Sequence, residues 1–75
     1  MDGEYHIFVT ASTNHIENAD YITYGITIHS EEGMASVENL STDFAAVNAL
    51  CARLQKGRLS PRHLGDLVED WLAGG

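Results

Sequence analysis

Strict alternation between apolar and polar side chains runs through residues 20–30 of this chain. One side of this segment is formed by Ile22, Tyr24, Ile26 and Ile28. Because successive side chains of a strand point to opposite faces, the pattern predicts a β-strand whose isoleucine face lies in the core. A glycine inside such a strand, here Gly25, is typical of a bulge or of close approach by another group.

Residues 4–10 form a second segment with β character, because they are rich in aromatic and β-branched side chains. Both faces of this strand carry apolar residues, so its inward face stays open. The polar stretch 11–19 follows, and Asn14 and Asn18 are its expected turn positions. The first strand is free to run some way into this stretch and form a longer hairpin.

A third strand is expected over residues 34–40, although its β character is weaker. It follows a turn over residues 30–33, in which Gly33 is free to adopt a positive φ. Val37 is the residue of this strand that we expect in the core.

The hydrophobic spacing changes to three and four in the second half of the chain, which is typical of helices. The first predicted helix covers residues 42–56, begins at Ser41 or Thr42 and ends at Gly57, the expected left-handed C-cap. Asp43 then lies in the first turn, where a negative charge interacts favourably with the helix dipole. The apolar face of this helix is expected to contain Phe44, Val47, Leu50, Cys51 and Leu54.

The second predicted helix covers residues 61–72. Ser60 is a good N-cap, and Pro61 follows at the first helical position, where its missing N–H is not needed. The apolar stripe of this helix contains Leu64, Leu67, Val68, Trp71 and Leu72. If Trp71 is only partly buried, it is a candidate anchor for a protein partner.

Three strands followed by two helices predict one small α+β domain over residues 1–75. The expected architecture is a three-stranded antiparallel meander followed by a two-helix hairpin packed on one sheet face (β-β-β-α-α). Its core joins the isoleucine row of the middle strand to the apolar sides of both helices. The residues expected to meet there include Ile22, Ile26, Leu64 and Val68.

Several short motifs of this sequence occur together in one known family. They are Tyr24-Gly25-Ile26, Asn39-Leu40-Ser41-Thr42-Asp43, Leu59-Ser60-Pro61, His63-Leu64, Asp66, Val68-Glu69-Asp70 and Trp71-Leu72. In this order they resemble a family of short bacterial proteins with a Tyr-Gly-Ile strand, an Ile-Ser-Thr-Asp helix start and a final Leu-Ser-Pro-x-His-Leu…Val-Glu-Asp-Phe-Leu helix. Leu40 and Trp71 replace the family's isoleucine and phenylalanine, and the resemblance covers the chain from Asp20 onward. It implies a bacterial cytoplasmic protein without an assigned activity.

Eleven acidic and four basic residues give the chain a formal charge of −7. This charge disfavours nucleic acid as a partner, because affinity for phosphates depends mainly on Lys and Arg, and it disfavours an anionic membrane surface. The single cysteine, Cys51, cannot form an internal disulfide, which fits a reducing compartment. No signal peptide or long apolar run is visible, so we expect a cytoplasmic protein.

All four basic residues lie close together around the predicted interhelical turn. The candidate residues for binding a phosphate or a partner's carboxylate there are Arg58, Ser60, Arg62 and His63. The N-terminus of the second helix, with its free N–H groups, favours such an anion. The simpler interpretation is structural, because Arg62 is able to pair with Asp66 one turn later.

Neither metal binding nor catalysis is indicated by the remaining residues. His6 and His29 could meet on the outer face of the sheet, but a zinc site needs further ligands. Cys51 is expected in the core, and Ser41 and Ser60 are explained as helix caps, so no nucleophile stands beside a base. We therefore expect no metal, no cofactor and no enzyme activity.

The sheet face turned away from the helices is the second candidate surface. Its expected contact residues are Phe8, Tyr21 and Thr23. Aromatic residues on an open sheet face suit a protein contact, although they are also simply good strand formers. The sequence therefore favours a small non-enzymatic module that binds a protein partner or itself. The alternative is a binder of a small anionic ligand at the interhelical turn.

Overall fold

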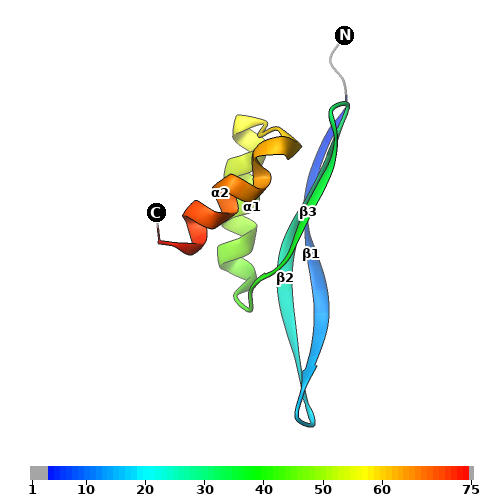
Figure 1. Ribbon diagram of the computed structural model, residues 1–75, viewed down its shortest axis with the longest axis vertical. Helices are drawn as coiled ribbons and strands as arrows, with labels where there is room; N and C mark the ends of the chain where they lie inside the picture. Colours follow the sequence, from blue (N-terminus) through cyan, green and yellow to red (C-terminus); the bar gives the residue numbers. More distant parts are fainter. Residues whose placement is uncertain (1–3, 75) are drawn as a thin grey trace.

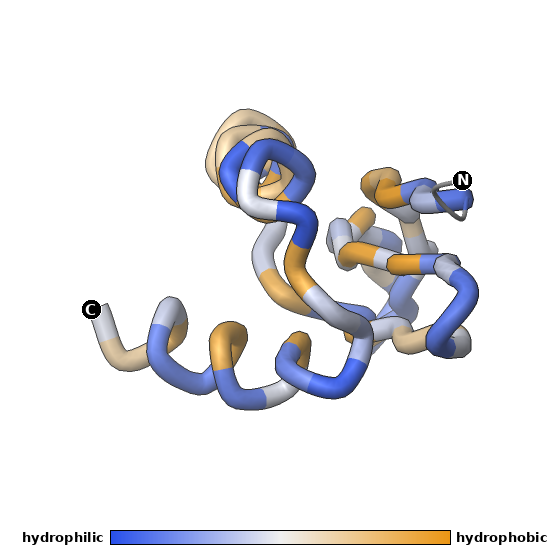
Figure 2. The backbone as a smooth tube through the Cα atoms, turned by 90° about the horizontal axis from the view of Figure 1, so that it is seen from above, coloured by the Kyte–Doolittle hydropathy of each residue, from blue (hydrophilic) through white to orange (hydrophobic). Residues whose placement is uncertain are grey.

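The computed structural model describes residues 4–74, with three strands and two helices in the expected order (Figure 1). The elements are β1 (Tyr5–Ile16), β2 (Ala19–Ser30), β3 (Gly33–Ser41), α1 (Phe44–Gly57), the 3-10 turn η1 (Pro61–His63) and α2 (Leu64–Leu72). The strands pair in the antiparallel order β1-β2-β3, and both helices lie on one face of this sheet (Figure 2). The predicted β-β-β-α-α architecture is therefore confirmed.

β1 and β2 form a hairpin that is longer than the two strands predicted from the sequence. Glu17 and Asn18 connect them with positive φ values of 45° and 63°, as in a type I′ turn, whose twist matches that of the strands. Asn18 is thus at the turn as expected, whereas Asn14 lies within β1. The Asn14 amide donates a 2.7 Å hydrogen bond to Thr23 Oγ1 of β2, which stabilises a cross-strand position instead of a turn.

The far end of this hairpin extends beyond β3 and beyond both helices (Figure 1). The molecule is accordingly elongated, with extents of 50 × 24 × 18 Å. Ile22 lies in the extended part and is 49% exposed. The prediction that Ile22 joins the core is wrong, because the helices do not reach that far along the sheet.

A bulge in β3 explains the glycine in the middle of β2. Ile26 of β2 lies opposite Val37 of β3. The next pair is Tyr24 with Ser41, so β3 contains extra residues at this point. They bring the β3 backbone against Gly25, where a Cβ would lie only 2.2 Å from the Val37 carbonyl oxygen. Gly25 is therefore required by close approach of the neighbouring strand.

The bulge also decides which side chain of β3 is fully buried. Asn39 takes a left-handed conformation with a φ of 58°, and its Oδ1 accepts a 2.5 Å hydrogen bond from Thr23 Oγ1. Leu40 follows and is only 7% exposed in the core. Val37, the expected core residue, packs against the core but is half-buried, because β3 is an edge strand.

α1 begins later than Ser41 or Thr42, so the predicted start is wrong. Asp43 is the N-cap, and its carboxylate accepts a 3.3 Å hydrogen bond from an N–H of the first turn. Ser41 still belongs to β3, and its hydroxyl accepts a 3.0 Å hydrogen bond from the Asp43 N–H. Phe44 is the first helical residue and is 50% exposed, with its ring edge-to-face against Tyr24. Phe44, which was expected on the apolar face of this helix, is therefore not part of the core.

A Schellman motif ends α1, with Arg58 rather than Gly57 in the left-handed conformation. The Arg58 N–H donates a 3.1 Å hydrogen bond to the Gln55 carbonyl oxygen. The Leu59 N–H donates another of 3.1 Å to the Leu54 carbonyl oxygen. This pair of bonds places the left-handed position one residue later than predicted, and Gly57 completes the helix.

Ser60 caps the second helical segment as expected, because its hydroxyl accepts a 3.4 Å hydrogen bond from the Arg62 N–H. Pro61 follows in the first turn, which is a 3-10 turn, and the α-helix continues from Leu64. No helix within residues 4–74 combines the length and the apolar character needed to cross a bilayer.

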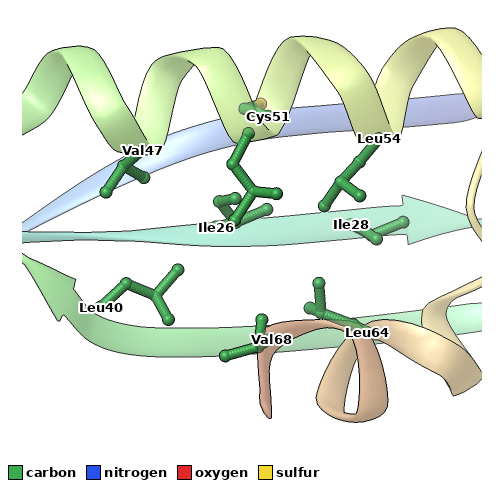
Figure 3. Close-up of a cluster of buried hydrophobic side chains, with 9 residues drawn as sticks. Ile26, Ile28, Leu40, Val47, Cys51, Leu54, Leu64 and Val68 are labelled. Carbon is green, nitrogen blue, oxygen red and sulfur yellow. The ribbon is translucent and has the colours of Figure 1, made fainter. Parts of the chain in front are cut away.

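The core lies between the sheet and the two helices (Figure 3). Its buried residues are Ile26, Ile28, Leu40, Val47, Leu50, Cys51, Leu54, Leu64 and Val68. α1 packs on β1 and β2, while α2 packs on β3 and leads away from the sheet toward its C-terminal end (Figure 2). Trp71 near that end is half-buried and Leu72 is 60% exposed, although both belong to the predicted apolar stripe.

Candidate functional site

Two surfaces carry the residues that the sequence singles out. The first is a cavity of about 250 Å³ between the start of β1, the β2–β3 turn and the interhelical turn. It is lined by Glu4, Tyr5, Ser30, Glu31, Glu32, Arg58, Ser60 and Pro61. The second is the outer face of the sheet, which is the face turned away from α1 and α2.

Tyr5 connects the first strand to the interhelical turn at this cavity. Its hydroxyl donates a 2.8 Å hydrogen bond to the Leu59 carbonyl oxygen, and the Arg58 guanidinium lies 5.0 Å from the centroid of its ring. The Ser60 hydroxyl donates a hydrogen bond to the Glu32 carboxylate. The cavity is thus held together by contacts between segments that are far apart in the sequence.

Acidic side chains dominate the charge of the cavity. Three glutamates line it, against one cation, Arg58. Arg62 and His63, which were expected in the same cluster, are exposed and do not line it. The Ser60 hydroxyl is already engaged by a carboxylate. Because like charges repel, this geometry counts against the anion site that the sequence indicates here.

Raising the pH above about 10 is expected to destabilise the fold through Tyr5. Burial raises the pKa of its hydroxyl above the ordinary value, and the nearby Arg58 guanidinium lowers it by less. Because the pKa is higher in the folded state, the contribution of Tyr5 to the free energy of unfolding is fully present below the unfolded-state pKa. It is lost as the pH rises through the folded-state pKa. Urea unfolding followed by circular dichroism across this pH range measures the loss.

In the variant Tyr5→Phe, the free energy of unfolding is expected to fall less as the pH rises above about 10. Because the variant also lacks the hydrogen bond to Leu59, its free energy of unfolding at neutral pH should be lower by about 1 kcal/mol. Tyr21→Phe is the matched control, because it removes a phenol hydroxyl from the exposed outer face. An unchanged alkaline decline in Tyr5→Phe would contradict the assignment to Tyr5.

Cys51 provides the only thiol of the chain, and it is 6% exposed within the core. Burial raises the pKa of this thiol. Because the thiolate is the reactive form of cysteine, a buried thiol with a raised pKa is a poor nucleophile at neutral pH. Cys51 therefore acts as a packing residue, as the helical pattern indicates.

The outer face carries exposed apolar side chains from all three strands. Phe8 of β1 is 48% exposed, Tyr21 of β2 is 38% exposed and Met34 of β3 is 69% exposed. Thr23, the third contact residue expected from the sequence, is only 7% exposed. Its hydroxyl bonds to two asparagine side chains, so it stabilises the sheet instead of offering a contact.

Four residues of this face lie together and are called the outer-face patch: His6, Phe8, His29 and Met34. His6 pairs with His29 and His29 with Met34 across the three strands. Phe8 lies two positions after His6, on the same side of β1. Tyr21 lies about 26 Å from His29 along β2, at the rise of an extended strand, and is therefore separate from the patch.

Met34 is the member of the patch that sequence reasoning missed. Its orientation follows from the alternation of β3, because Val37 faces the helices and a position three residues earlier faces the opposite side. The alternation of residues 34–40 therefore contains the signal for Met34, although the β character of this segment is weak.

His6 and His29 face each other across β1 and β2, as the sequence anticipates. His6 Nε2 also lies 3.5 Å from the Glu4 carboxylate. Within the described residues 4–74, no group of three or more His, Cys, Asp or Glu side chains is arranged to hold a metal ion. The histidine pair therefore forms a polar part of the outer face.

Comparison with protein families gives one match that covers nearly the whole chain. A family model described as a family of unknown function (DUF6514) matches residues 1–74. No curated protein and no solved structure matches the chain. The family match includes the first strand, which the motif resemblance did not cover. The bacterial setting implied by that resemblance stays a prediction.

Proposed function

This chain belongs to the family of unknown function DUF6514, and from that premise we propose that it is a small, non-enzymatic protein-interaction module. The proposed contact surface is the outer-face patch. A cytoplasmic location is part of the proposal, because a single cysteine without a disulfide partner suits a reducing compartment.

The observation that carries this proposal is the exposure of Phe8 and Met34 on the sheet face opposite both helices. Burying an aromatic ring removes a large apolar area from water, and such rings are enriched at the centres of protein interfaces. The flexible thioether of Met34 adapts to the shape of a partner. His6 and His29 supply ring nitrogens that bond to polar groups at the rim.

A non-enzymatic role is supported by the state of the candidate nucleophiles. The Cys51 thiol is buried and its pKa is raised. The Ser60 hydroxyl caps a helical turn and donates a hydrogen bond to the Glu32 carboxylate. Among residues 4–74 no other side chain donates a hydrogen bond to that carboxylate, so it is not oriented as the base of a catalytic pair. The alternative function, binding of a small anion beside Arg58, is set aside because three glutamates line the same cavity.

Replacing the two apolar members of the patch is expected to abolish partner binding. We suggest affinity purification of the tagged chain from extract of its native cells, with quantitative mass spectrometry of the retained proteins. The double variant Phe8→Ser, Met34→Ser should reduce retention of specific partners by about tenfold or more, the loss of roughly 1.4 kcal/mol or more of binding energy.

The matched control for this experiment is Leu72→Ser, which removes a similarly exposed apolar side chain from the opposite layer of the molecule. It should retain the partners. Equal retention by the double variant, with circular dichroism showing that it is folded, would refute the outer-face patch as the contact surface. Absence of any specific partner for the unmodified chain would count against the proposed function itself.

A further inference from the structure

The two edges of the sheet differ in how they are protected from pairing with another strand. β3 forms one edge, and its pairing is interrupted by the bulge at Asn39. β1 forms the other edge and pairs with β2 over twelve consecutive residues without a register shift. Natural sheets commonly protect edge strands with bulges, prolines or charged side chains, because an open edge is a template for a further strand. β1 has none of these devices.

The hairpin register shows which backbone groups of β1 face outward. A two-residue hairpin is closed by a hydrogen-bonded pair, here Ile16 with Ala19. Counting back from this pair, even-numbered residues of β1 bond to β2 and odd-numbered residues direct their N–H and C=O groups to the free edge. These outward residues are Tyr5, Ile7, Val9, Ala11, Thr13 and His15. No other strand of the described chain pairs with them.

The side chains along this edge are neutral and partly apolar. Residues 5–16 contain no Asp, Glu, Lys or Arg, although the chain as a whole carries a charge of −7. Two copies can therefore approach each other along β1 without bringing acidic side chains together. Ile7 and Val9 pack against the core but are only half-buried, so apolar surface remains at the edge for a second copy to cover.

We propose that a second copy of this chain pairs with β1 in an antiparallel manner, giving a homodimer with one continuous six-stranded sheet. A two-fold axis perpendicular to the sheet makes β1 complementary to itself, since each outward N–H finds a C=O of the other copy. This axis keeps both helical layers on the same face. Ile7, Val9 and Ala11 of the two copies then lie opposite one another, and the two small cores become adjacent.

A second copy is the occupant that these observations favour over an unrelated extended peptide. The same strand offers donors, acceptors and a half-buried apolar row in a symmetric arrangement, which an isologous dimer satisfies without further components. The surface is distinct from the outer-face patch, so the inference does not depend on the proposed function.

Sedimentation equilibrium of the full chain tests the dimer, with concentrations from about 1 μM to about 1 mM so that weak and moderate association are both detected. The expected result is a species of twice the 8.2 kDa chain mass. Ala11→Pro removes an outward N–H while leaving the bonds to β2 in place, since proline is tolerated on the free side of an edge strand. It should raise the Kd of the dimer by about tenfold or more.

Ser36→Pro is the matched control at the other edge. Counting from the closing pair Ser30 with Gly33 shows that the Ser36 N–H also points outward, but from β3. This variant should remain dimeric. If Ala11→Pro does not fold, Ala11→Glu is the variant that tests whether β1 forms the dimer interface. It places two like charges at that interface and should also produce monomers.

A monomer at every concentration would overturn the proposal, as would a folded Ala11→Pro or Ala11→Glu variant that remains a full dimer. A dimer lost in Phe8→Ser, Met34→Ser but kept in Ala11→Pro would also overturn it, since association would then use the outer face. Loss of the dimer without loss of partner retention would leave the proposed function intact, so the two proposals fail separately.

Discussion

Replacing Gly25 with alanine is expected to lower the free energy of unfolding by about 3 kcal/mol. The added Cβ would lie 2.2 Å from the Val37 carbonyl oxygen and 2.8 Å from the Glu38 Cα. Both contacts are with backbone atoms of the bulge, which cannot rotate away as a side chain can. The sheet must therefore separate or the bulge must rearrange. Urea unfolding followed by circular dichroism measures the difference.

Gly65→Ala is the matched control for this substitution. Gly65 lies on the exposed side of α2, and apart from its chain neighbours and the backbone of its own helix no atom lies within 4 Å of an added Cβ. Alanine has the higher helix propensity, so this variant should gain about 0.5 kcal/mol. If Gly25→Ala has the same stability as the unmodified chain, the strands are not as close at the bulge as described.

Replacing Ile26 with alanine is expected to lower the free energy of unfolding by about 3 to 4 kcal/mol. Ile26 is fully buried between the middle strand and the helices (Figure 3), so its truncation leaves a cavity that the packed neighbours cannot fill. For a domain of this size, a loss of this magnitude is a large part of the total stability. Chemical unfolding monitored by the fluorescence of Trp71 provides the measurement.

Ile22→Ala tests the same chemical change on the same side of the same strand. Because Ile22 is about half exposed on the overhanging hairpin, its truncation should lower stability by less than about 1 kcal/mol. Equal losses at Ile22 and Ile26 would mean that the helices extend further along the sheet than described.

The contrast between these two isoleucines shows what local sequence patterns were able to predict. Alternation correctly identified the strand and the side of it that carries Ile26 and Ile28. Capping chemistry identified Ser60, because an N-cap depends only on neighbouring residues. Burial of Ile22 was wrong because burial depends on where α1 lies over the sheet, and no local pattern contains that information.

The candidate surfaces also depend on tertiary contacts that local sequence patterns do not contain. Phe8 was expected on the outer face, although alternation left the inward face of its strand open, and the structure has Phe8 exposed there. The cavity was not predicted, because it depends on Ser60 meeting Glu32, 28 positions away. A cluster that looks cationic along the sequence therefore becomes acidic in space, once the β2–β3 turn brings its glutamates beside Arg58.

The connection of neighbouring strands by two-residue turns also bears on how the chain folds. The entropy of closing a loop rises with its length, so both hairpins can form early and at small entropic expense. The helical segment must then pack against the first strand, where the Tyr5 hydroxyl donates its hydrogen bond to the Leu59 carbonyl oxygen, 54 positions later in the sequence. Because non-local contacts form slowly, we expect the packing of the helices on the sheet to limit the folding rate.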